Sequence, residues 1–371
     1  MPTAIPTDPP RMATAAVYEA PNTPFALKEF PLRPVRRREV LVRVSMSTIC
    51  RSDIHSYEGR RPNPCPGILG HEIIGRIVEI GEDVAQDMRG APLQIGDRIT
   101  WSEYFFDGEC YYREVLDMPQ KCQGVRKYGH DLASEDPHFL GGFAEYCYIL
   151  PGTWILKLPP DLSDEEATPL NCGVATMAAV TEAATIGLGD AVVIQGLGLL
   201  GLYGAAMAKA RGARCVIGLD GVAHRLQIGK KFGVDHAIDV SRGARSVVEQ
   251  VRMLCPPDGA DAVIEVCGAP EVIPQGLKML RVGGRYVIAG LVNPEANVTI
   301  DANMLVKRCV SMRGVHNYHP RHLIVALDFV MANRSRFPFK EIVDAKFALK
   351  DLNAAFHKAA ERSVLRAAVV P

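Results

Sequence analysis

Residues 191–201 read Ala-Val-Val-Ile-Gln-Gly-Leu-Gly-Leu-Leu-Gly, and they decide the fold of the second half of the chain. The run 191–195 predicts a buried strand, and Gly196, Gly198 and Gly201 lead into an alanine-rich helix that reaches residue 210. A G-x-G-x-x-G motif between a strand and a helix binds a dinucleotide, because glycines let the backbone approach the pyrophosphate and the helix N-terminus favours its charge. The stretch therefore predicts a doubly wound α/β domain with a dinucleotide site.

The strand predicted next, at residues 215–219, ends at Asp220, nineteen residues past Gly201. A carboxylate there accepts hydrogen bonds from the ribose 2′-hydroxyl and repels a 2′-phosphate, so Asp220 predicts NAD rather than NADP. Arg225 could also reach the ribose, but one arginine does not cancel the carboxylate. Further strands are predicted at 237–240, 262–266, 285–289 and near 315, and further helices at 246–254 and 272–280.

A second stretch, residues 50–72, concentrates reactive side chains: it begins with Cys50 and ends with His71 and Glu72. Thiolate and imidazole donors together suit zinc, whose catalytic sites take three protein ligands and leave a fourth position open. Cys50 and His71 are therefore candidate metal ligands. A buried cysteine and a polar Gly-His-Glu turn would explain the same residues without a metal.

Residues 70–75, Gly-His-Glu-Ile-Ile-Gly, resemble the zinc signature of the medium-chain alcohol dehydrogenases. The resemblance covers nearly the whole chain from about residue 12. It continues through residues 50–53, 141–146, 171–176 and the glycine loop.

This resemblance implies an α/β protein with two domains. One is a GroES-like β-barrel catalytic domain formed by residues 13–174 and 310–371, and the other is a Rossmann NAD-binding domain at 175–309. Residues 13–100 agree with a barrel, because short runs rich in Val and Ile between turn residues predict an antiparallel β region. Within it, residues 82–93 are expected to form a loop.

The resemblance also implies an active site. Its zinc ligands would be Cys50, His71 and Cys172, and the bound metal would let an alcohol lose its proton near neutral pH and give hydride to NAD. Asp53 would orient His71 through a hydrogen bond. Glu72 would lie next to the zinc ligands without binding the metal, or would act as an occasional fourth ligand.

Further positions match the proton relay and the cofactor contacts of the family. Ser52 and His55 match the relay, and Arg51 and Arg366 match positions that contact the cofactor pyrophosphate. Thr176 would pack beside the nicotinamide. Each has a plainer alternative: a turn cap for Ser52, an ordinary surface position for His55 and the arginines, and core packing for Thr176.

Residues 104–140 form a polar lobe in which relatives carry four cysteines that bind a second, structural zinc. The corresponding positions here are Asp107, Cys110, Arg113 and Cys122, so only two are cysteines. Arginine stays protonated and cannot ligate zinc. We expect this zinc to be absent and Arg113, paired with Asp107, to put a cation in its place. The alternative is a rearranged lobe in which neither residue compensates.

The composition argues against several function classes. Lysine plus arginine and aspartate plus glutamate number 42 each, which disfavours a nucleic-acid or membrane-surface partner. No apolar run reaches about 18 residues and the N-terminus has no signal pattern, so a soluble, cytoplasmic protein is expected. Residues 1–12 predict a flexible tail. The ten cysteines, among them Cys215, Cys267 and Cys309, are expected to be reduced core residues.

These observations predict a zinc-dependent, NAD-linked alcohol dehydrogenase that converts a primary or secondary alcohol to its aldehyde or ketone, reversibly. A homo-oligomer, dimer or tetramer, is expected by analogy. One alternative is an NADPH-dependent carbonyl or enone reductase of the same superfamily, against which Asp220 and the three ligands stand. Another is a non-catalytic nucleotide sensor, which the retained ligand and relay residues disfavour.

Two groups of residues outside these motifs carry weaker expectations. Trp101, Tyr104 and Phe105 could line a pocket for a bulky apolar substrate or belong to the core. The remaining histidines are expected on the surface or in loops; they include His130, His138, His316, His319 and His322.

Overall fold

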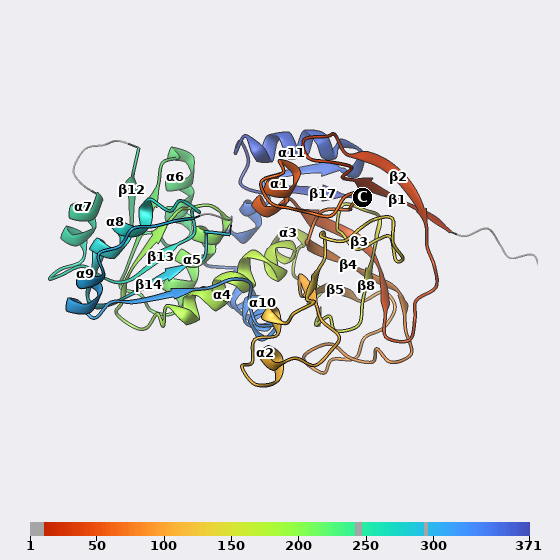
Figure 1. Cartoon of the computed structure of the whole chain (residues 1–371), viewed down its shortest axis with the longest axis horizontal. Helices are drawn as coiled ribbons and strands as arrows, with labels where there is room; N and C mark the ends of the chain where they lie inside the picture. Colours follow the sequence, from red (N-terminus) through yellow and green to blue (C-terminus); the bar gives the residue numbers. More distant parts are fainter. Residues whose placement is uncertain (1–10, 242–246, 293–295) are drawn as a thin grey trace, which may run out of the picture. The chain divides into compact units, whose positions relative to one another are not determined.

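The computed structural model describes residues 11–241, 247–292 and 296–371, and the chain divides into two compact units (Figure 1). Unit 1 comprises Met1–Thr168 and Val343–Pro371, and unit 2 comprises Pro169–Ile342. The sequence analysis placed the boundaries near 174 and 309. The second boundary differs because β15 (Ser311–Gly314) still pairs in the sheet of unit 2 and α10 (Arg321–Asn333) packs against α4 (Gly173–Ala183) there.

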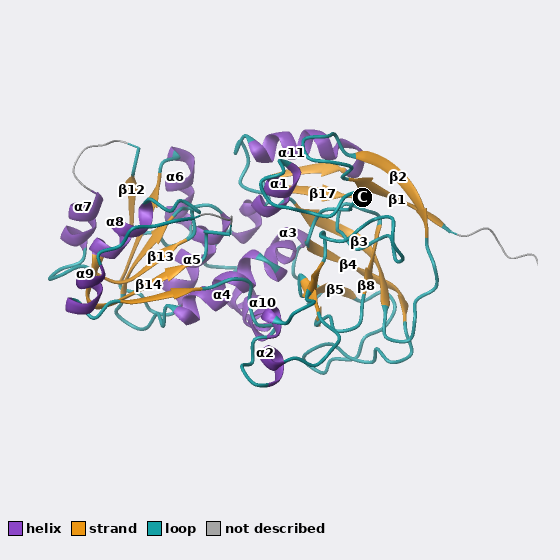
Figure 2. Cartoon of the chain, viewed as in Figure 1, coloured by secondary structure: helices purple, strands orange, loops and turns teal. Residues whose placement is uncertain are grey.

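Unit 1 is built on a mainly antiparallel sheet, drawn in orange in Figure 2. Its strand order is β16-β17-β3-β4-β5-β9. The strand β8 pairs with the first residues of β3, whereas β17 pairs with its last residues. Among the described strands of this sheet, β16 and β17 are the one parallel pair. This confirms the antiparallel region predicted over residues 13–100. The strands are β3 (Val40–Thr48), β4 (Glu72–Ile80), β5 (Arg98–Trp101), β8 (Tyr146–Ile149), β9 (Ile155–Lys157), β16 (Ala345–Ala348) and β17 (Ala367–Val370).

The central strand β3 is buried on both faces, since Val40, Leu41 and Val42 are all inaccessible to solvent. A continuous buried run of this kind is typical of a strand covered on both sides. All three belong to the core that contains Trp101 and Phe139. Ile49, directly after β3, belongs to a second core with Ile54 and Phe356. These two cores fix the ends of β3 and β4, where the candidate ligands lie.

The smaller elements of unit 1 surround this sheet. Residues 82–93 contain neither helix nor strand, as expected. Residues 1–10 of the expected tail lie outside the described residues, and Met12, the last residue of that expected tail, belongs to β1 instead. The elements are β1 (Met12–Val17), β2 (Ala26–Pro31), β6 (Tyr104–Phe105), β7 (Arg126–Lys127), α1 (Arg51–Tyr57), α2 (Tyr111–Glu114), α3 (Asp164–Ala167) and α11 (Leu352–Ala360), with short 3-10 turns at Pro119–Lys121 and Leu349–Asp351 and a third, Thr168–Asn171, at the boundary of the units.

Unit 2 is a parallel sheet with strand order β12-β11-β10-β13-β14-β15. This is the 3-2-1-4-5-6 order of a Rossmann fold, so the doubly wound sheet predicted from residues 191–201 is confirmed. Its strands are β10 (Ala191–Gln195), β11 (Cys215–Asp220), β12 (His236–Asp239), β13 (Ala260–Glu265), β14 (Leu280–Ile288) and the sixth strand β15.

The helices of unit 2 alternate with these strands along the chain (Figure 2). The helix predicted at 246–254 is α7, although residue 246 lies outside the described residues. Among the described residues, no helix is both long and apolar enough to cross a membrane. The helices are α4, α5 (Leu199–Ala210), α6 (Ala223–Lys231), α7 (Val247–Leu254), α8 (Val272–Met279), α9 (Ala302–Lys307) and α10, with a 3-10 turn at Phe339–Ile342.

Candidate metal centre and cofactor loop

Asp53 joins the start of α1 to the segment that precedes β4. Cys50 is the N-cap residue of α1, and its backbone N–H donates to Asp53 Oδ2 over 2.8 Å in a capping box. Asp53 Oδ1 lies 3.1 Å from His71 Nδ1 and accepts from the backbone N–H of Gly70. This is the contact that the sequence analysis expected of Asp53. Since a carboxylate only accepts, the neutral ring carries its proton on Nδ1 and offers Nε2 as a metal ligand.

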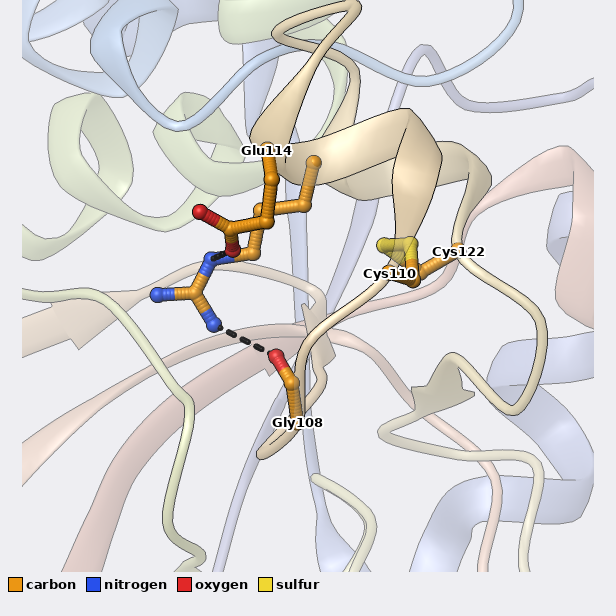
Figure 3. The surroundings of a disulfide bond; sticks show 5 residues. Gly108, Cys110, Glu114 and Cys122 are labelled. Carbon is orange, nitrogen blue, oxygen red and sulfur yellow. Dashed lines mark hydrogen bonds and ion pairs between the residues drawn. A yellow bond between two sulfur atoms is a disulfide. The ribbon is translucent and has the colours of Figure 1, made fainter.

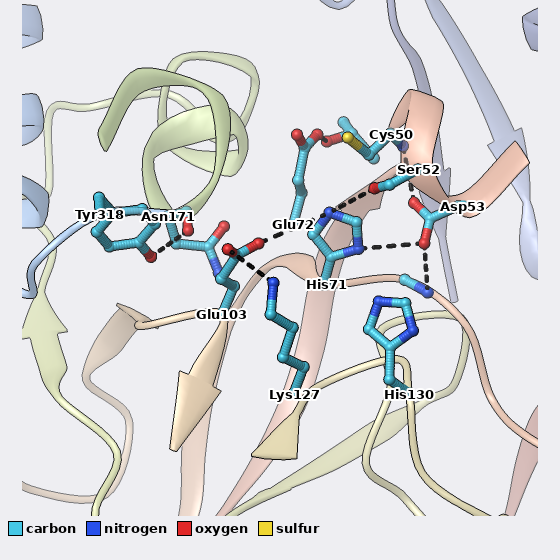
Figure 4. Close-up of polar contacts among 12 residues, drawn as sticks. Cys50, Ser52, Asp53, His71, Glu72, Glu103, Lys127, His130, Asn171 and Tyr318 are labelled. Carbon is cyan, nitrogen blue, oxygen red and sulfur yellow. Dashed lines mark hydrogen bonds and ion pairs between the residues drawn. The ribbon is translucent and has the colours of Figure 1, made fainter. Parts of the chain in front are cut away.

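The ligand atoms of Cys50, His71 and Glu72 converge. They lie within 4.8 Å of one another, and His71 and Glu72 are buried (Figure 4). One thiolate, one imidazole whose Nε2 lies on the side away from Asp53, and a nearby carboxylate are a donor set that fits zinc. Burial lowers the pKa of His71, but Asp53 and Cys50 more than offset it and raise that pKa well above its usual range. A metal must therefore displace a proton from this ring.

Glu72 is held from two sides. The hydroxyl of Thr48 donates to Glu72 Oε2, and Arg366 Nη2 lies 3.3 Å from Glu72 Oε1. Burial raises the pKa of Glu72 to about 7, with Arg366 acting in the opposite direction. Arg366 is itself buried and donates to the carbonyl of Ile49 over 2.8 Å. These contacts hold Arg366 in the wall of the metal centre; its expected contact with the pyrophosphate stays a prediction.

The relay residues lie on α1. Ser52 Oγ is 3.4 Å from His71 Nε2, and Ser52 and His55 are both half-buried three residues apart on the helix, which puts them on one face. Arg51, the first residue of α1, is half-buried as well. The placement fits a path from the metal-facing nitrogen toward solvent, and the relay itself stays a prediction.

Three residues that the sequence analysis did not select surround His71. Glu103 Oε2 lies 4.0 Å from His71 Nε2, and Glu103 Oε1 lies 3.5 Å from Lys127 Nζ (Figure 4). The ring of His130 stacks on that of His71, with centroids 6.0 Å apart. Burial lowers the pKa of His130 well below its usual range. Glu103 could have been found from the sequence because it lies between Trp101 and Tyr104. Aromatic residues on both sides favour burial of a carboxylate.

The predictions for the lobe at 104–140 are partly wrong. Cys110 and Cys122 are joined in a disulfide (Figure 3), whereas the cysteines were all expected to be reduced. Asp107 does not pair with Arg113: both its oxygens accept from Arg38, each over 2.8 Å. Arg113 instead donates to the carbonyl of Gly108 and pairs with Glu114 at 3.3 Å. The rearranged lobe, the alternative reading, is therefore the better description.

Several other expectations about single residues are corrected. Cys267 and Cys309 are exposed rather than core residues, while Cys215 is buried as expected. His322 is buried in α10 rather than on the surface. The aromatic residues of β5 and β6 belong to the interior, because Trp101, Tyr104 and Phe105 are all buried.

The glycine loop of unit 2 has the backbone that its sequence predicts. Gly196 has a φ of +101°, and a Cβ on Gly201 would lie 1.9 Å from the carbonyl oxygen of Gly196, so both positions require glycine. Gly198 is the N-cap of α5, and a Cβ there would meet no protein atom within 4 Å. The first turn of α5 thus begins beside open space, which suits an approaching phosphate.

Asp220 at the end of β11 is tied to this loop. Its Oδ2 accepts from the backbone N–H of Leu197 over 2.8 Å, its Oδ1 accepts from that of Val222 over 2.9 Å, and Arg225 Nη1 lies 3.9 Å from Oδ2. Asp220 therefore shapes the loop, and Arg225 stands beside it as the sequence suggested.

Cys172 and Thr176 lie in unit 2. Cys172 is the half-buried N-cap residue of α4, and the backbone N–H of Thr176, also half-buried, donates to its carbonyl over 2.9 Å. The segment before Cys172 is braced by Tyr318, whose hydroxyl donates to the carbonyl of Asn171 (Figure 4). Tyr318 lies between His316 and His319, so this stretch of the chain has a structural role.

Comparison with known proteins agrees with this architecture. Residues 36–160 match the alcohol dehydrogenase GroES-like domain, and residues 200–332 match the zinc-binding dehydrogenase domain. A sorbitol dehydrogenase of Halalkalibacterium halodurans is 31% identical over 94% of this chain and 96% of its own length. The chain belongs to the zinc-dependent medium-chain dehydrogenase family.

Two further relatives of this dehydrogenase show the range of the family. The 5-exo-hydroxycamphor dehydrogenase of Pseudomonas putida is 29% identical over 85% of this chain and 87% of its own length. The crystal structure of an alcohol dehydrogenase from Thermotoga maritima superposes with a TM-score of 0.93 at 29% identity, and covers 97% of this chain and 100% of the other. The GroES-like and Rossmann expectations for the fold are thereby confirmed, and the chain is an oxidoreductase of the dehydrogenase type.

Proposed function

We propose that this dehydrogenase oxidises a primary or secondary alcohol to its aldehyde or ketone with NAD, at one zinc ion per chain. The observation that carries the proposal is the convergence of Cys50 and His71, with Asp53 on the far nitrogen of the ring. Cys172 is proposed as the third ligand, since it is a half-buried thiol outside any disulfide at a helix N-terminus, where a thiolate is favoured.

Zinc held there would act as a Lewis acid that lowers the pKa of a bound alcohol. The residues of the chain supply the rest. Asp53 holds the ring of His71 so that Nε2 points to the metal, and Thr48 and Arg366 keep Glu72 behind the ligands. Ser52 is proposed to accept the alcohol proton and His55 to release it, because an imidazole has an ordinary pKa near neutrality.

NAD is proposed as the cofactor from the position of Asp220. The glycine loop would take the pyrophosphate, with Arg51 and Arg366 as further partners, and Thr176 would pack by the nicotinamide. Asp220 is fixed by two backbone N–H groups, and its charge would repel a 2′-phosphate. Small alcohols or carbonyls are the proposed partners, in a homo-oligomer.

The test is cofactor reduction by the purified protein with a panel of alcohols, using NAD and NADP in parallel. The proposal expects turnover with NAD, and loss of most turnover and of zinc in Cys172→Ser. Asp220→Gly should relax the preference for NAD. Cofactor binding without turnover on a broad panel would point instead to a nucleotide sensor, and a preference for NADP would point to the reductase.

A further inference from the structure

Two buried thiols of unit 2 lie in contact with each other. Cys215 is the first residue of β11, and Cys255 directly follows Leu254, the last residue of α7. The two side chains are hydrogen bonded to each other and belong to the same hydrophobic core, in which Cys215 is 8% exposed and Cys255 is 0% exposed. Two sulfur atoms in such contact are close enough to react with each other once one of them is oxidised.

The backbone holds both cysteines in place. Cys215 lies opposite Ala191 in the parallel pairing of β10 and β11. The backbone N–H of Gly259 donates to the carbonyl of Cys255 over 2.8 Å, and the N–H of Cys255 donates to the carbonyl of Arg252 over 3.3 Å. Because a paired strand and a hydrogen-bonded turn carry the two side chains, the contact between the sulfur atoms is built into the fold of unit 2.

The groups around Cys215 favour its thiolate. The hydrogen bond from Cys255 makes the largest contribution and lowers the pKa of Cys215 to about 7, although burial opposes it. Arg214 and Lys209 act in the same direction as this bond, and Asp235 acts against it. Lys209 Nζ lies 2.7 Å from Asp235 Oδ2, which offsets the charge of that carboxylate. Since the thiolate is the nucleophilic form of cysteine, Cys215 is the attacking sulfur of the pair.

Cys255 is held as the neutral thiol. The same hydrogen bond raises the pKa of Cys255, and burial and Asp261 add to this effect. The contact is what separates the pair from other cysteines, because burial raises the pKa of Cys147, and that of Cys267 to about 12. A nucleophilic sulfur beside a second thiol is the arrangement found where cysteines are oxidised reversibly.

We propose that Cys215 and Cys255 are an oxidant-reactive pair that a hydroperoxide converts to a disulfide. The sulfur of Cys215 attacks one oxygen of the peroxide and the O–O bond breaks. The other oxygen leaves as water or an alcohol, and Cys215 becomes a sulfenic acid. The sulfur of Cys255 then attacks that of Cys215, an S–S bond forms and water leaves with the proton of Cys255. The two thiols lose two electrons in total, and the peroxide takes them up.

The position of the pair predicts what the cross-link does. Cys215 and Asp220 are the two ends of β11, and a strand rise of about 3.3 Å per residue puts them roughly 16 Å apart. The disulfide therefore joins β11 to the turn after α7 at the end of the strand away from Asp220. A cross-link between residues far apart in the sequence restricts the unfolded chain and stabilises the folded one. This inference needs neither zinc nor turnover, so it stands apart from the proposed function.

The test treats the purified protein with a small molar excess of hydrogen peroxide, followed by catalase, alkylation and digestion without reductant. Mass spectrometry should find the peptides of Cys215 and Cys255 joined. Cys255→Ala should leave a sulfenic acid at Cys215 that dimedone traps, whereas Cys215→Ala should leave none at Cys255. Cys147→Ala, which removes another buried cysteine, is the matched control and should keep the cross-link.

Thermal unfolding gives a second readout. In the background Cys110→Ala/Cys122→Ala, where a reductant can act only on the new disulfide, peroxide should raise the unfolding midpoint by about 5 °C or more. Dithiothreitol should reverse the rise, and adding Cys255→Ala should abolish it.

The midpoints before treatment check that each variant is folded, and Cys215→Ala replaces Cys255→Ala in this measurement if the latter does not fold. A folded wild type that takes up peroxide at other cysteines, with residues 215 and 255 still alkylated as thiols, would overturn the proposal. A dimedone label at Cys255 in the Cys215→Ala variant would overturn the assignment of Cys215 as the attacking sulfur.

Discussion

Two regions of unit 1 carry cysteines where the family binds zinc, and the fold treats them in opposite ways. In the first, Cys50 and His71 come from separate elements and converge, and Asp53 orients the ring. In the second, Cys110 and Cys122 join each other in a disulfide, so neither sulfur remains a thiolate for a metal. Asp107 and Arg113 turn to other partners. A metal site thus needs free donors that converge and a residue behind them that fixes their orientation.

The largest expected effect is at the converging site. Cys50→Ser removes a thiolate ligand, so it should abolish stoichiometric zinc binding and lower kcat/KM by at least about a hundredfold. Even mutation of a residue that only hydrogen-bonds to a metal ligand lowers metal affinity or activity by about 10–100-fold. Elemental analysis and steady-state kinetics measure the two effects. Cys309→Ser, at an exposed cysteine, is the control. Full zinc content in Cys50→Ser would mean that Cys50 is not a zinc ligand.

The next effect concerns the disulfide. The double variant Cys110→Ala/Cys122→Ala should lose about 2–4 kcal/mol of unfolding free energy in denaturant titrations, because the cross-link closes a short loop of the unfolded chain. Wild type in a thiol reductant should show the same loss. Zinc per chain and activity should stay at wild-type values. A drop in zinc content in the double variant would mean that the lobe binds metal after all.

A smaller loss of stability is expected when the ion pair between Arg33 and Glu39 is broken. Arg33 donates to both oxygens of Glu39, which is buried. Burial raises the pKa of Glu39, but the bonds from Arg33 and Arg36 outweigh it and the net pKa is lowered. Glu39→Gln should therefore cost about 1–3 kcal/mol near neutral pH, the size of a hydrogen bond to a charged group.

The pH dependence of this effect follows from the sign of the shift. A carboxyl group whose pKa is lowered on folding stabilises the protein above its ordinary value of 4.5, and that stabilisation is lost as the pH falls through the folded-state pKa. Unfolding titrations from pH 7 to pH 3 should show the gap between wild type and Glu39→Gln closing only below about pH 4.5. A gap that is constant over this range would mean that packing, not charge, sets the effect.

The smallest effect on stability is expected from the exposed ion pair between Arg38 and Asp107. Both Arg38 and Asp107 are about half exposed. Exposed ion pairs contribute little, so Asp107→Asn should leave the unfolding midpoint and zinc content within error of wild type. Loss of a metal ion from this variant would mean that Asp107 is a metal ligand.

The sequence could predict the features that depend on short spacing. The order strand, Gly196 to Gly201, helix and Asp220 predicted the sheet of unit 2, and the segment 50–72 predicted that Cys50 and His71 come together as candidate ligands. It could not predict contacts that arise from pairing of distant segments. Glu103 lies near Lys127 because β6, which begins directly after Glu103, pairs with β7, which ends at Lys127. The disulfide was missed because Cys110 and Cys122 were considered only as possible zinc ligands, and the domain boundary was set too early because β15 still belongs to the sheet of unit 2.

The most direct test of the contrast between the two regions is the zinc content of the purified protein after dialysis without chelator. The account predicts one zinc ion per chain, absent from Cys50→Ser and retained in the Cys110→Ala/Cys122→Ala variant. Two ions per chain would mean that the lobe binds metal beside its cysteines. No zinc in a folded, cofactor-binding protein would contradict the metal centre at Cys50 and His71.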